Sequence, residues 1–264
     1  MKKNLLSNLL NQKSIKSLFK VFDKKSQEIS LVGGCVRDAY FNKISKDIDV
    51  AANIIPDEIL TILNKNNIKY DDYAYNYGSI TAFIEDQTFQ ITSLREDINP
   101  IGRHTDIIFT NNWKKDSARR DFTINSIYLS CNGQLTDFFN GKEDLMNNTL
   151  RFLGEIEKSI QQDYLRIFRY YRFLGVFENP NLISEYDDSL SQHIEKSFNF
   201  LSNDLIRQEI LKMFKSSFPM NCFFDKKNTS KKKYWIESVK EHFTKTGYDI
   251  GLNKCLNKID LLFN

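Results

Sequence analysis

The hydrophobic pattern of this 264-residue chain changes near residues 150–158. Before that point, short apolar runs and alternating segments are separated by glycine, proline and asparagine, which predicts strands joined by turns and short helices. From residue 159 onward, apolar residues recur at helical spacing through SIQQDYLRIFRYYRFLGVF, LSNDLIRQEILKMF and YWIESVKEHF. We therefore predict an α+β fold, with a mixed-sheet domain at residues 1–155 and an all-helical region at 156–264.

The same patterns predict individual elements of the first domain. The apolar spacing over residues 4–22 predicts one amphipathic helix, and the composition of residues 95–108 predicts a mobile loop. The remaining expectations are a strand at 28–33, a short helix at 36–42, a strand at 47–51, a helix at 56–64, a hairpin at 78–94, and a helix leading into a strand at 119–130.

Composition limits the class of protein. Apolar residues make up 41% of the chain, which excludes a disordered protein, and the net charge of +3 requires any nucleic-acid contact to use clustered basic residues. The four cysteines form no CxxC pair, so neither a zinc site nor a disulfide framework is predicted. No apolar run reaches the length of a signal peptide or a membrane span, which favours a cytoplasmic location without membrane partners.

Two aspartates in the predicted strand DIDVA are the first candidate site. Alternate strand residues share a face, so Asp47 and Asp49 present two carboxylates side by side. Such a pair repels unless a cation neutralises it, and Mg²⁺ takes oxygen ligands while leaving positions for substrate phosphates. The alternative for an isolated DxD pair is a solvated strand edge.

A glycine pair precedes these aspartates, in LVGGCVRDAYFNKISKDIDVA at residues 31–51. Gly33 and Gly34 would let backbone N–H groups approach a polyphosphate, and Arg37 would add a charge-assisted hydrogen bond. The combination favours a nucleoside triphosphate held beside Mg²⁺, in a two-metal site where a hydroxyl attacks the α-phosphorus and pyrophosphate leaves.

Three segments together resemble a known family. The segment at 31–51 resembles the first motif of the class II tRNA nucleotidyltransferases (the CCA-adding enzymes) and bacterial poly(A) polymerases, within the polymerase-β superfamily. RRDFTINSIYL at 119–129 resembles the second motif, and QDYLRIFRYYRF at 162–173 resembles the base-selecting helix. The resemblance implies a polymerase-β-like head, then a helical neck and body. It covers roughly residues 28–175.

The resemblance also implies roles for individual residues. Asp47 and Asp49 would be the catalytic metal ligands, while residues of the second motif would bind the triphosphate and the ribose, namely Arg119, Arg120, Asp121 and Asn125. Gln90 stands where many relatives carry an acid, so no third metal carboxylate is assigned. The 95–108 segment matches a loop that helps switch specificity from C to A, with Arg95, Asp97 and Arg103 as candidate members.

The base-selecting segment has a chemical interpretation of its own. Asp163 and Arg166 are three residues apart, which predicts a shared helix face, and Arg169 and Arg172 continue the same spacing. The family resemblance implies that these two arginines lie near the nucleotide. Cytosine and adenine both present an amino donor beside a ring-nitrogen acceptor, which suits a carboxylate beside a guanidinium. Uracil and guanine present the opposite pattern. The alternative is a surface ion pair.

We therefore expect a template-independent enzyme that adds or repairs the 3′-terminal CCA of tRNA with CTP, ATP and Mg²⁺. Two alternatives are an enzyme that adds only A or makes poly(A), and an inactive RNA-binding remnant. The basic segment at 225–235 and the helix at 205–216 are candidate RNA contacts. Relatives continue further, so a protein partner or an oligomer would compensate for the short C-terminal region.

Overall fold

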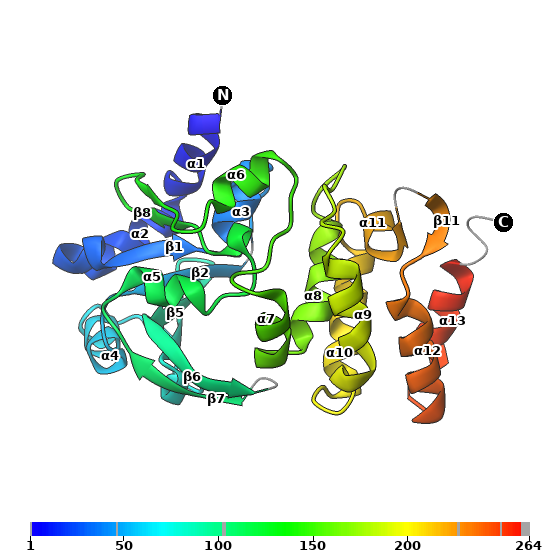
Figure 1. Cartoon of the computed structure of the whole chain (residues 1–264). Helices are drawn as coiled ribbons and strands as arrows, with labels where there is room; N and C mark the ends of the chain where they lie inside the picture. Colours follow the sequence, from blue (N-terminus) through cyan, green and yellow to red (C-terminus); the bar gives the residue numbers. More distant parts are fainter. Residues whose placement is uncertain (1, 46, 102–103, 226–227, 249, 260–264) are drawn as a thin grey trace. The chain divides into compact units, whose positions relative to one another are not determined.

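The computed structural model describes residues 2–45, 47–101, 104–225, 228–248 and 250–259. The chain divides into two compact units (Figure 1). The first unit comprises Met1–Asn99 and Asp106–Met146, and the second comprises Pro100–Thr105 and Asn147–Asn264. The sequence-based boundary after residue 155 would place the second domain at the start of α7 (Ile156–Gln162).

A mixed seven-stranded sheet forms the core of the first unit. Its order is β3-β4-β5-β2-β1-β8-β9, in which β2 and β5 are parallel and the other neighbours are antiparallel. The strands are β1 (Ile29–Val32), β2 (Asp47–Ala52), β3 (Lys69–Asp71), β4 (Ser79–Ile84), β5 (Gln87–Ser93), β8 (Tyr128–Ser130) and β9 (Leu135–Thr136). All four residues of β1 are buried, which suits a central strand.

Helices cover this sheet, and the sequence explains where two of them begin. Pro56 occupies the first turn of α4, and the Asn112 side chain caps α5 by accepting hydrogen bonds from Lys114 N and Lys115 N. The helices are α1 (Lys2–Leu10), α2 (Lys13–Phe22), α3 (Gly34–Tyr40), α4 (Pro56–Lys65), α5 (Trp113–Ala118) and α6 (Gly141–Met146). Short 3₁₀ turns are η1 (Asp23–Glu28), η2 (Tyr75–Tyr77) and η3 (Thr123–Asn125).

Three sequence-based expectations for this unit were wrong in detail. The helix at 4–22 is two helices, because Gln12 is extended and starts α2. The 95–108 segment forms a two-stranded sheet of β6 (Arg95–Ile101) and β7 (His104–Phe109), not an irregular loop. In the segment at 119–130, the expected helix is only the single turn η3 before β8.

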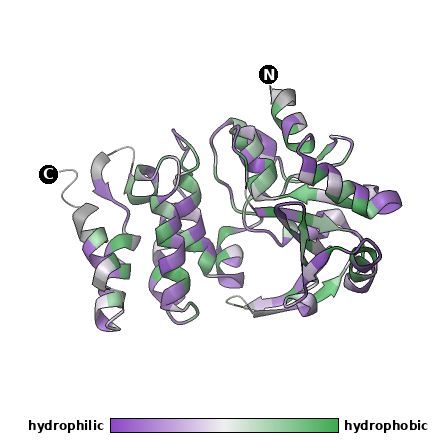
Figure 2. Cartoon of the chain, turned by 180° about the vertical axis from the view of Figure 1, so that it is seen from behind, coloured by the Kyte–Doolittle hydropathy of each residue, from purple (hydrophilic) through white to green (hydrophobic). Residues whose placement is uncertain are grey.

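The second unit is mainly helical, and hydrophobic and hydrophilic residues alternate along its helices (Figure 2). Its helices are α7 (Ile156–Gln162), α8 (Leu165–Leu174), α9 (Tyr186–Ser197), α10 (Asn203–Phe214), α11 (Met220–Phe223), α12 (Trp235–Lys245) and α13 (Ile250–Ile259). The expected basic loop at 225–235 instead contains a small sheet of β10 (Phe224–Asp225) and β11 (Asn228–Lys232). Trp235 is fully buried and contacts Phe168, Tyr171 and Phe223.

No helix in the described ranges is long and apolar enough to cross a membrane.

Candidate active site

The glycine turn and the acid pair lie against each other in the first unit. Gly33 follows β1 with φ +74°, a conformation that favours glycine, and α3 begins at the next residue. The antiparallel register of β1 and β2 sets Asp49 opposite Val32. A Cβ atom built on Gly33 would lie 3.4 Å from Asp49 Oδ2 and 3.9 Å from Arg120 Nη1. The glycine turn, Asp49 and Arg120 of the second motif therefore meet at one point.

The two aspartates have the exposure that a metal site requires. Ile48 between them is buried, whereas Asp47 is exposed and Asp49 is partly exposed, as expected for alternate residues of a half-buried strand. Gln90 of β5 pairs with Asp49 in register. Within the described residues, no group of three or more His, Cys, Asp or Glu side chains could hold a metal. Two carboxylates suit Mg²⁺, because that ion keeps further positions for phosphate oxygens.

A buried hydrogen-bond network ties the helix after the glycines to the second motif. Arg37 Nη1 donates to Asn125 Oδ1 at 2.7 Å, and Asn125 Nδ2 donates to Asp121 Oδ1 at 3.0 Å. Arg37 also pairs with Asp38 Oδ1, at 2.7 Å from Nη2. All three network residues, Arg37, Asp121 and Asn125, are buried. The network fixes the orientation of three residues that are expected to bind the phosphates and the ribose of the nucleotide.

Asp116 is a candidate site residue that the sequence analysis missed. Its carboxylate lies 2.8 Å from Arg119 Nη2 and 3.1 Å from Arg120 Nη2, and it accepts a 2.7 Å hydrogen bond from the Tyr128 hydroxyl. Burial would raise the pKa of Asp116, but the two arginines and Tyr128 lower it to about 2. Its spacing of three and four residues before Arg119 and Arg120 was the signal available in the sequence.

Arg120 retains a donor for a ligand. Its Nε is buried, and within the described part of the chain it has no hydrogen-bond partner. Buried donors without a partner are uncommon in proteins, and a guanidinium donor suits a phosphate oxygen. Arg120 also lies over the Tyr128 ring, with 5.4 Å from its Cζ to the ring centroid.

The candidate specificity segment begins beside this cluster. The Arg95 amide donates to Asp116 Oδ1 at 3.4 Å, and the Arg95 guanidinium donates to the Tyr77 carbonyl and pairs with Asp97 at 3.5 Å. Burial lowers the pKa of Arg95, and the nearby Arg119 adds to the effect. Arg103, the third candidate residue of this segment, lies outside the described residues.

In the second unit, the structure corrects the expected helix stripe. Asp163 is extended, with φ −150° and ψ 103°, and lies at the break between α7 and α8. Its Oδ1 accepts a 3.0 Å hydrogen bond from Leu165 N, so the side chain caps α8 and does not share a helix face with Arg166. The stripe of helix residues therefore contains only Arg166, Arg169 and Arg172.

The arginines of α8 have different environments. Arg166 is buried, and its Nη1 donates to Ser159 Oγ at 2.6 Å and to Gln162 Oε1 at 3.3 Å. Arg172 Nε donates to the buried carboxylate of Glu209 at 2.5 Å, and Lys212 contacts the same carboxylate at 2.8 Å. Arg169 lies over the Phe173 ring, 5.4 Å from its centroid.

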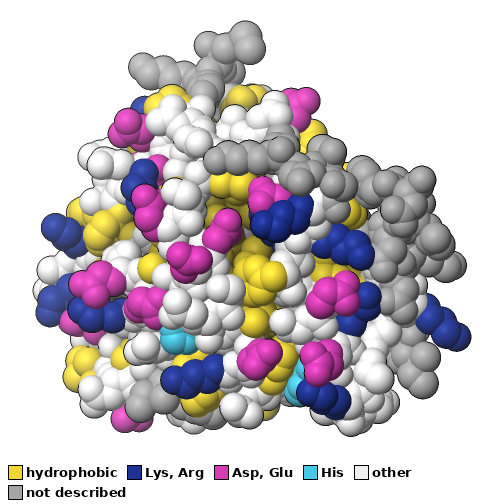
Figure 3. Space-filling model, turned by 45° about the vertical axis from the view of Figure 1, so that its right-hand side comes forward, with side chains coloured by type: hydrophobic (Ala, Val, Ile, Leu, Met, Phe, Trp, Pro, Cys, Tyr) yellow, Lys and Arg dark blue, Asp and Glu magenta, His cyan; other side chains and the backbone are white. Residues whose placement is uncertain are grey.

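The expected basic RNA contact is only partly exposed. Among the described side chains of the 225–235 segment, Lys231 is exposed but Lys233 is buried. Burial lowers the pKa of Lys233. On the face shown in Figure 3, positive and negative side chains are interspersed around hydrophobic ones. The described side chains on that face therefore do not form a continuous basic surface.

Comparisons with known proteins show what the chain is similar to. Residues 29–151 match the family model described as the poly A polymerase head domain. The chain is 42% identical over 162 residues to the human mitochondrial CCA tRNA nucleotidyltransferase 1, covering 61% of this chain and 37% of that protein.

Two solved structures have the same fold. The Bacillus stearothermophilus CCA-adding enzyme in complex with CTP matches with a TM-score of 0.68 and 22% identity, over 80% of this chain and 51% of that one. The Thermotoga maritima CCA-adding enzyme complexed with tRNA-CCA matches with a TM-score of 0.63 and 26% identity, over 82% and 52%. The chain thus spans about half the length of these two proteins. It spans 37% of the human relative.

The expected polymerase-β-like fold, a mixed sheet with helices followed by a helical part, is confirmed. Residues 29–151 are thus similar to the poly A polymerase head domain, and most of the same part of the chain is similar to CCA tRNA nucleotidyltransferases.

Proposed function

We propose that this chain is a template-independent tRNA nucleotidyltransferase that adds or repairs the 3′-terminal CCA from CTP and ATP. The observation that carries the proposal is the meeting of Gly33, Asp49 and Arg120 in the first unit. Two segments far apart in the sequence, the first and second motifs, there place a tight backbone turn, a carboxylate and a guanidinium with an unpartnered donor around one point.

The proposed site divides its tasks among these residues. Gly33 and Gly34 leave room for phosphates near the backbone, and Arg120 donates to them from the buried Nε. Asp116 orients Arg119 and Arg120, so their guanidinium groups are positioned before substrate arrives. Arg37 adds a charge-assisted hydrogen bond to the phosphates, and Asp121 and Asn125 hold the ribose side of the nucleotide. The tRNA 3′-hydroxyl oxygen attacks the α-phosphorus, and pyrophosphate leaves.

Asp47 and Asp49 would hold Mg²⁺, in keeping with their carboxylate chemistry and exposure. When bound, magnesium ions supply charge neutralisation at the phosphates and lower the pKa of the attacking hydroxyl. Gln90 cannot add a carboxylate, so these two aspartates form the donor set that we propose.

Base selection is proposed for the second unit. Arg166 is held by Ser159 and Gln162, while one oxygen of Asp163 is occupied by the Leu165 amide. The Asp163 carboxylate would accept from the amino group of cytosine or adenine, and Arg166 would donate to the ring nitrogen. Arg169 and Arg172 would lie towards the nucleotide, with Glu209 holding Arg172.

The alternatives differ in product. An enzyme that adds only A, or makes poly(A), would use the same metal and phosphate groups. The β6–β7 segment, with its anchor from Arg95 to Asp116 and its Arg95–Asp97 pair, favours an enzyme that can select A. An inactive RNA-binding remnant would have no need for the Asp116–Arg119–Arg120 arrangement.

A cytoplasmic location remains part of the proposal.

The deciding experiment incubates the purified chain with Mg²⁺, CTP, ATP and tRNA transcripts ending before CCA, after C or after CC. Products are read at single-nucleotide resolution. Addition of C, C and A in order supports the proposal. Addition of A alone to the CC transcript, or a long A ladder, selects the narrower alternatives. If the folded chain binds the transcript but does not extend it, the result supports the alternative of an inactive RNA-binding remnant.

A further inference from the structure

A pocket of about 420 Å³ lies in the first unit at the ends of two parallel strands, away from the aspartates. Residues at and after the end of β2, from Ala52 to Ile55, form one side of the pocket. Ser93, which ends β5, and Leu94, which follows it, form the other side. Phe109, Thr110 and Asn111 complete the wall. Ala52 lies three residues beyond Asp49 along β2, which corresponds to roughly 10 Å of extended strand.

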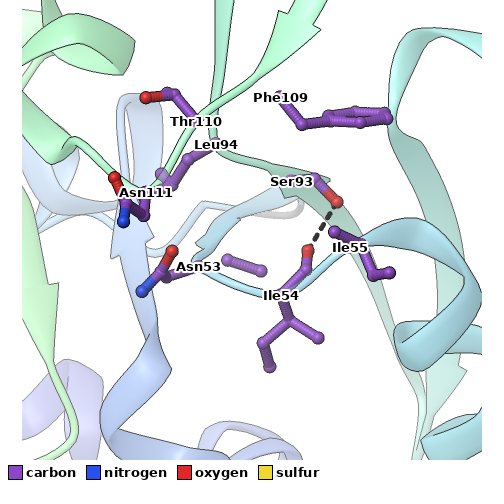
Figure 4. A pocket seen from close by; sticks show the side chains of 9 residues that line it. Asn53, Ile54, Ile55, Ser93, Leu94, Phe109, Thr110 and Asn111 are labelled. Atoms are coloured by element: carbon purple, nitrogen blue, oxygen red, sulfur yellow. Dashed lines mark hydrogen bonds between the residues drawn. The ribbon is translucent and has the colours of Figure 1, made fainter.

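Two side-chain amides face this pocket without a protein partner. Figure 4 shows Asn53 and Asn111 together on one side of the space, opposite Phe109 and Ile55. Within the described part of the chain, neither amide group makes a hydrogen bond. Each amide offers one acceptor oxygen and two N–H donors, so the pair can recognise an edge that carries both donors and acceptors.

The opposite wall is apolar and held in place. The Phe109 ring is 42% exposed, and its Cε1 lies 2.5 Å from where a Cβ on Gly78 would stand, so the ring packs directly over that glycine. Hydrogen bonds from Leu94 N to Ala52 O and from Thr110 N to Leu94 O join the strand ends beneath it, at 2.8 and 2.9 Å. An exposed aromatic ring held in this way suits stacking against a planar group.

Among the described residues that line the pocket, none has an ionisable side chain. Binding a phosphate, a carboxylate or an ammonium group here would desolvate a charge without a counter-charge, which is costly. The bound group must therefore be neutral, planar and edged with hydrogen-bonding groups. The volume of the pocket lies within the range of binding sites for small ligands.

We propose that this pocket binds a nucleobase, with the base stacked on Phe109 and its edge read by Asn53 and Asn111. The base could belong to a free nucleoside or nucleotide, or to a single-stranded segment of RNA, and the chemistry is the same for both. Leu94 directly precedes β6, and Phe109 is the last residue of β7. A bound base would therefore also restrain this end of the β6–β7 sheet. This site is separate from the proposed active site, and its binding does not depend on catalysis.

The test uses the ¹⁵N-labelled full chain and follows the side-chain NH₂ signals of Asn53 and Asn111. The signals are assigned by their loss in Asn53→Leu and Asn111→Leu. Each of the four ribonucleosides is titrated, a single-stranded RNA hexamer serves as the second source of bases, and ribose serves as the probe without a base. Because the signals are local, they report this pocket and not the proposed active site.

The expected result is a saturable shift of both NH₂ pairs with at least one nucleoside or with the hexamer, and none with ribose. A response to the hexamer alone identifies RNA as the source. Phe109→Ala should weaken binding about tenfold, as expected for loss of a base–aromatic stack. Ile108→Ala is the matched control, because Ile108 is 57% exposed but does not line the pocket.

Asn111→Leu should abolish binding while the thermal unfolding midpoint stays close to that of the wild type, because Asn111 is exposed. The proposal is overturned if neither amide responds to any base-containing probe, if ribose gives the same shifts, or if Ile108→Ala weakens binding as much as Phe109→Ala.

Discussion

Gly33 and Asp49 are in near contact across the β1–β2 pair: a Cβ added to the glycine would stand 3.4 Å from a carboxylate oxygen of the aspartate. This relationship joins the two halves of the first motif. The turn is shaped so that its backbone lies directly beside the acid, and only glycine allows that approach at φ +74°.

Gly33→Ala should therefore impair both folding and activity. The backbone of Gly33, with φ +74° and ψ −128°, lies outside the left-handed helical region and costs a non-glycine residue about 1–3 kcal/mol. The new methyl group would stand in van der Waals contact with Asp49 Oδ2 and take up space that we propose for the phosphates. Gly247→Ala is the control, because Gly247 has φ +66° and no neighbour within 4 Å. Both variants should lose similar stability in denaturant titrations, but only Gly33→Ala should lose nucleotide incorporation. Full incorporation by Gly33→Ala would contradict the proposed position of the phosphates.

Asp49→Asn should abolish nucleotide incorporation while tRNA binding and the unfolding midpoint stay close to those of the wild type. The substitution keeps the shape of the side chain but removes the charge that would hold Mg²⁺. Asp86→Asn, in the exposed turn between β4 and β5, serves as the control and should keep wild-type incorporation. Incorporation by Asp49→Asn equal to that control would disprove the metal assignment.

Asp116 should make stability depend on pH in the acid range. Its pKa falls from 3.8 to about 2 on folding, so the charged form stabilises the fold above about pH 4, and that contribution is lost as pH falls towards 2. The shift corresponds to about 2 kcal/mol. Asp116→Asn should thus be less stable than the wild type at pH 7, with a gap in unfolding free energy that narrows between pH 4 and 2.

Chemical denaturation of both proteins at several pH values measures this gap, with the exposed Asp86→Asn as the reference. A gap that stays constant from pH 7 to 2 would show that Asp116 stabilises the fold by shape and not by its charge. At neutral pH, the variant should also bind nucleotide more weakly, because Arg119 and Arg120 lose the group that orients them.

Much of the first unit follows from local signals in the sequence. The strand, the glycine turn, the short helix and the second strand are contiguous, and each segment carries its own pattern, so their prediction was accurate. The position of Arg120 beside Gly33 depends on long-range pairing of β8 with β1, which no spacing within the sequence reveals. Only the family resemblance connected the two motifs.

The errors have physical causes. Residues 95–108 contain Pro100 and Gly102, which favour a loop, but contacts from outside the segment hold β6, including Lys115 with Glu96 at 2.9 Å. The helix expected through Asp163 contains no glycine or proline between Ile160 and Leu165. There the aspartate side chain bonds to the Leu165 amide, which competes with a continuous helix.

That break makes Asp163→Asn an informative variant. One oxygen of Asp163 accepts from Leu165 N, and we propose that the carboxylate also reads the base. Asparagine keeps one oxygen for the cap, because Asn and Asp cap helices about equally well, and it presents an NH₂ donor in place of the second oxygen. A donor there opposes the amino groups of cytosine and adenine but suits the O4 acceptor of uracil. Incorporation of UTP should therefore rise and that of CTP should fall.

Asp163→Ala is the companion variant. It should lose about 1 kcal/mol of stability with the cap and relax selection without a preference for uracil. Single-turnover incorporation of CTP, ATP and UTP by the wild type and both variants, beside their unfolding free energies, separates the two roles. If Asp163→Asn selects nucleotides like the wild type while Asp163→Ala does not, selection depends on the position of α8, because the cap alone would then account for it.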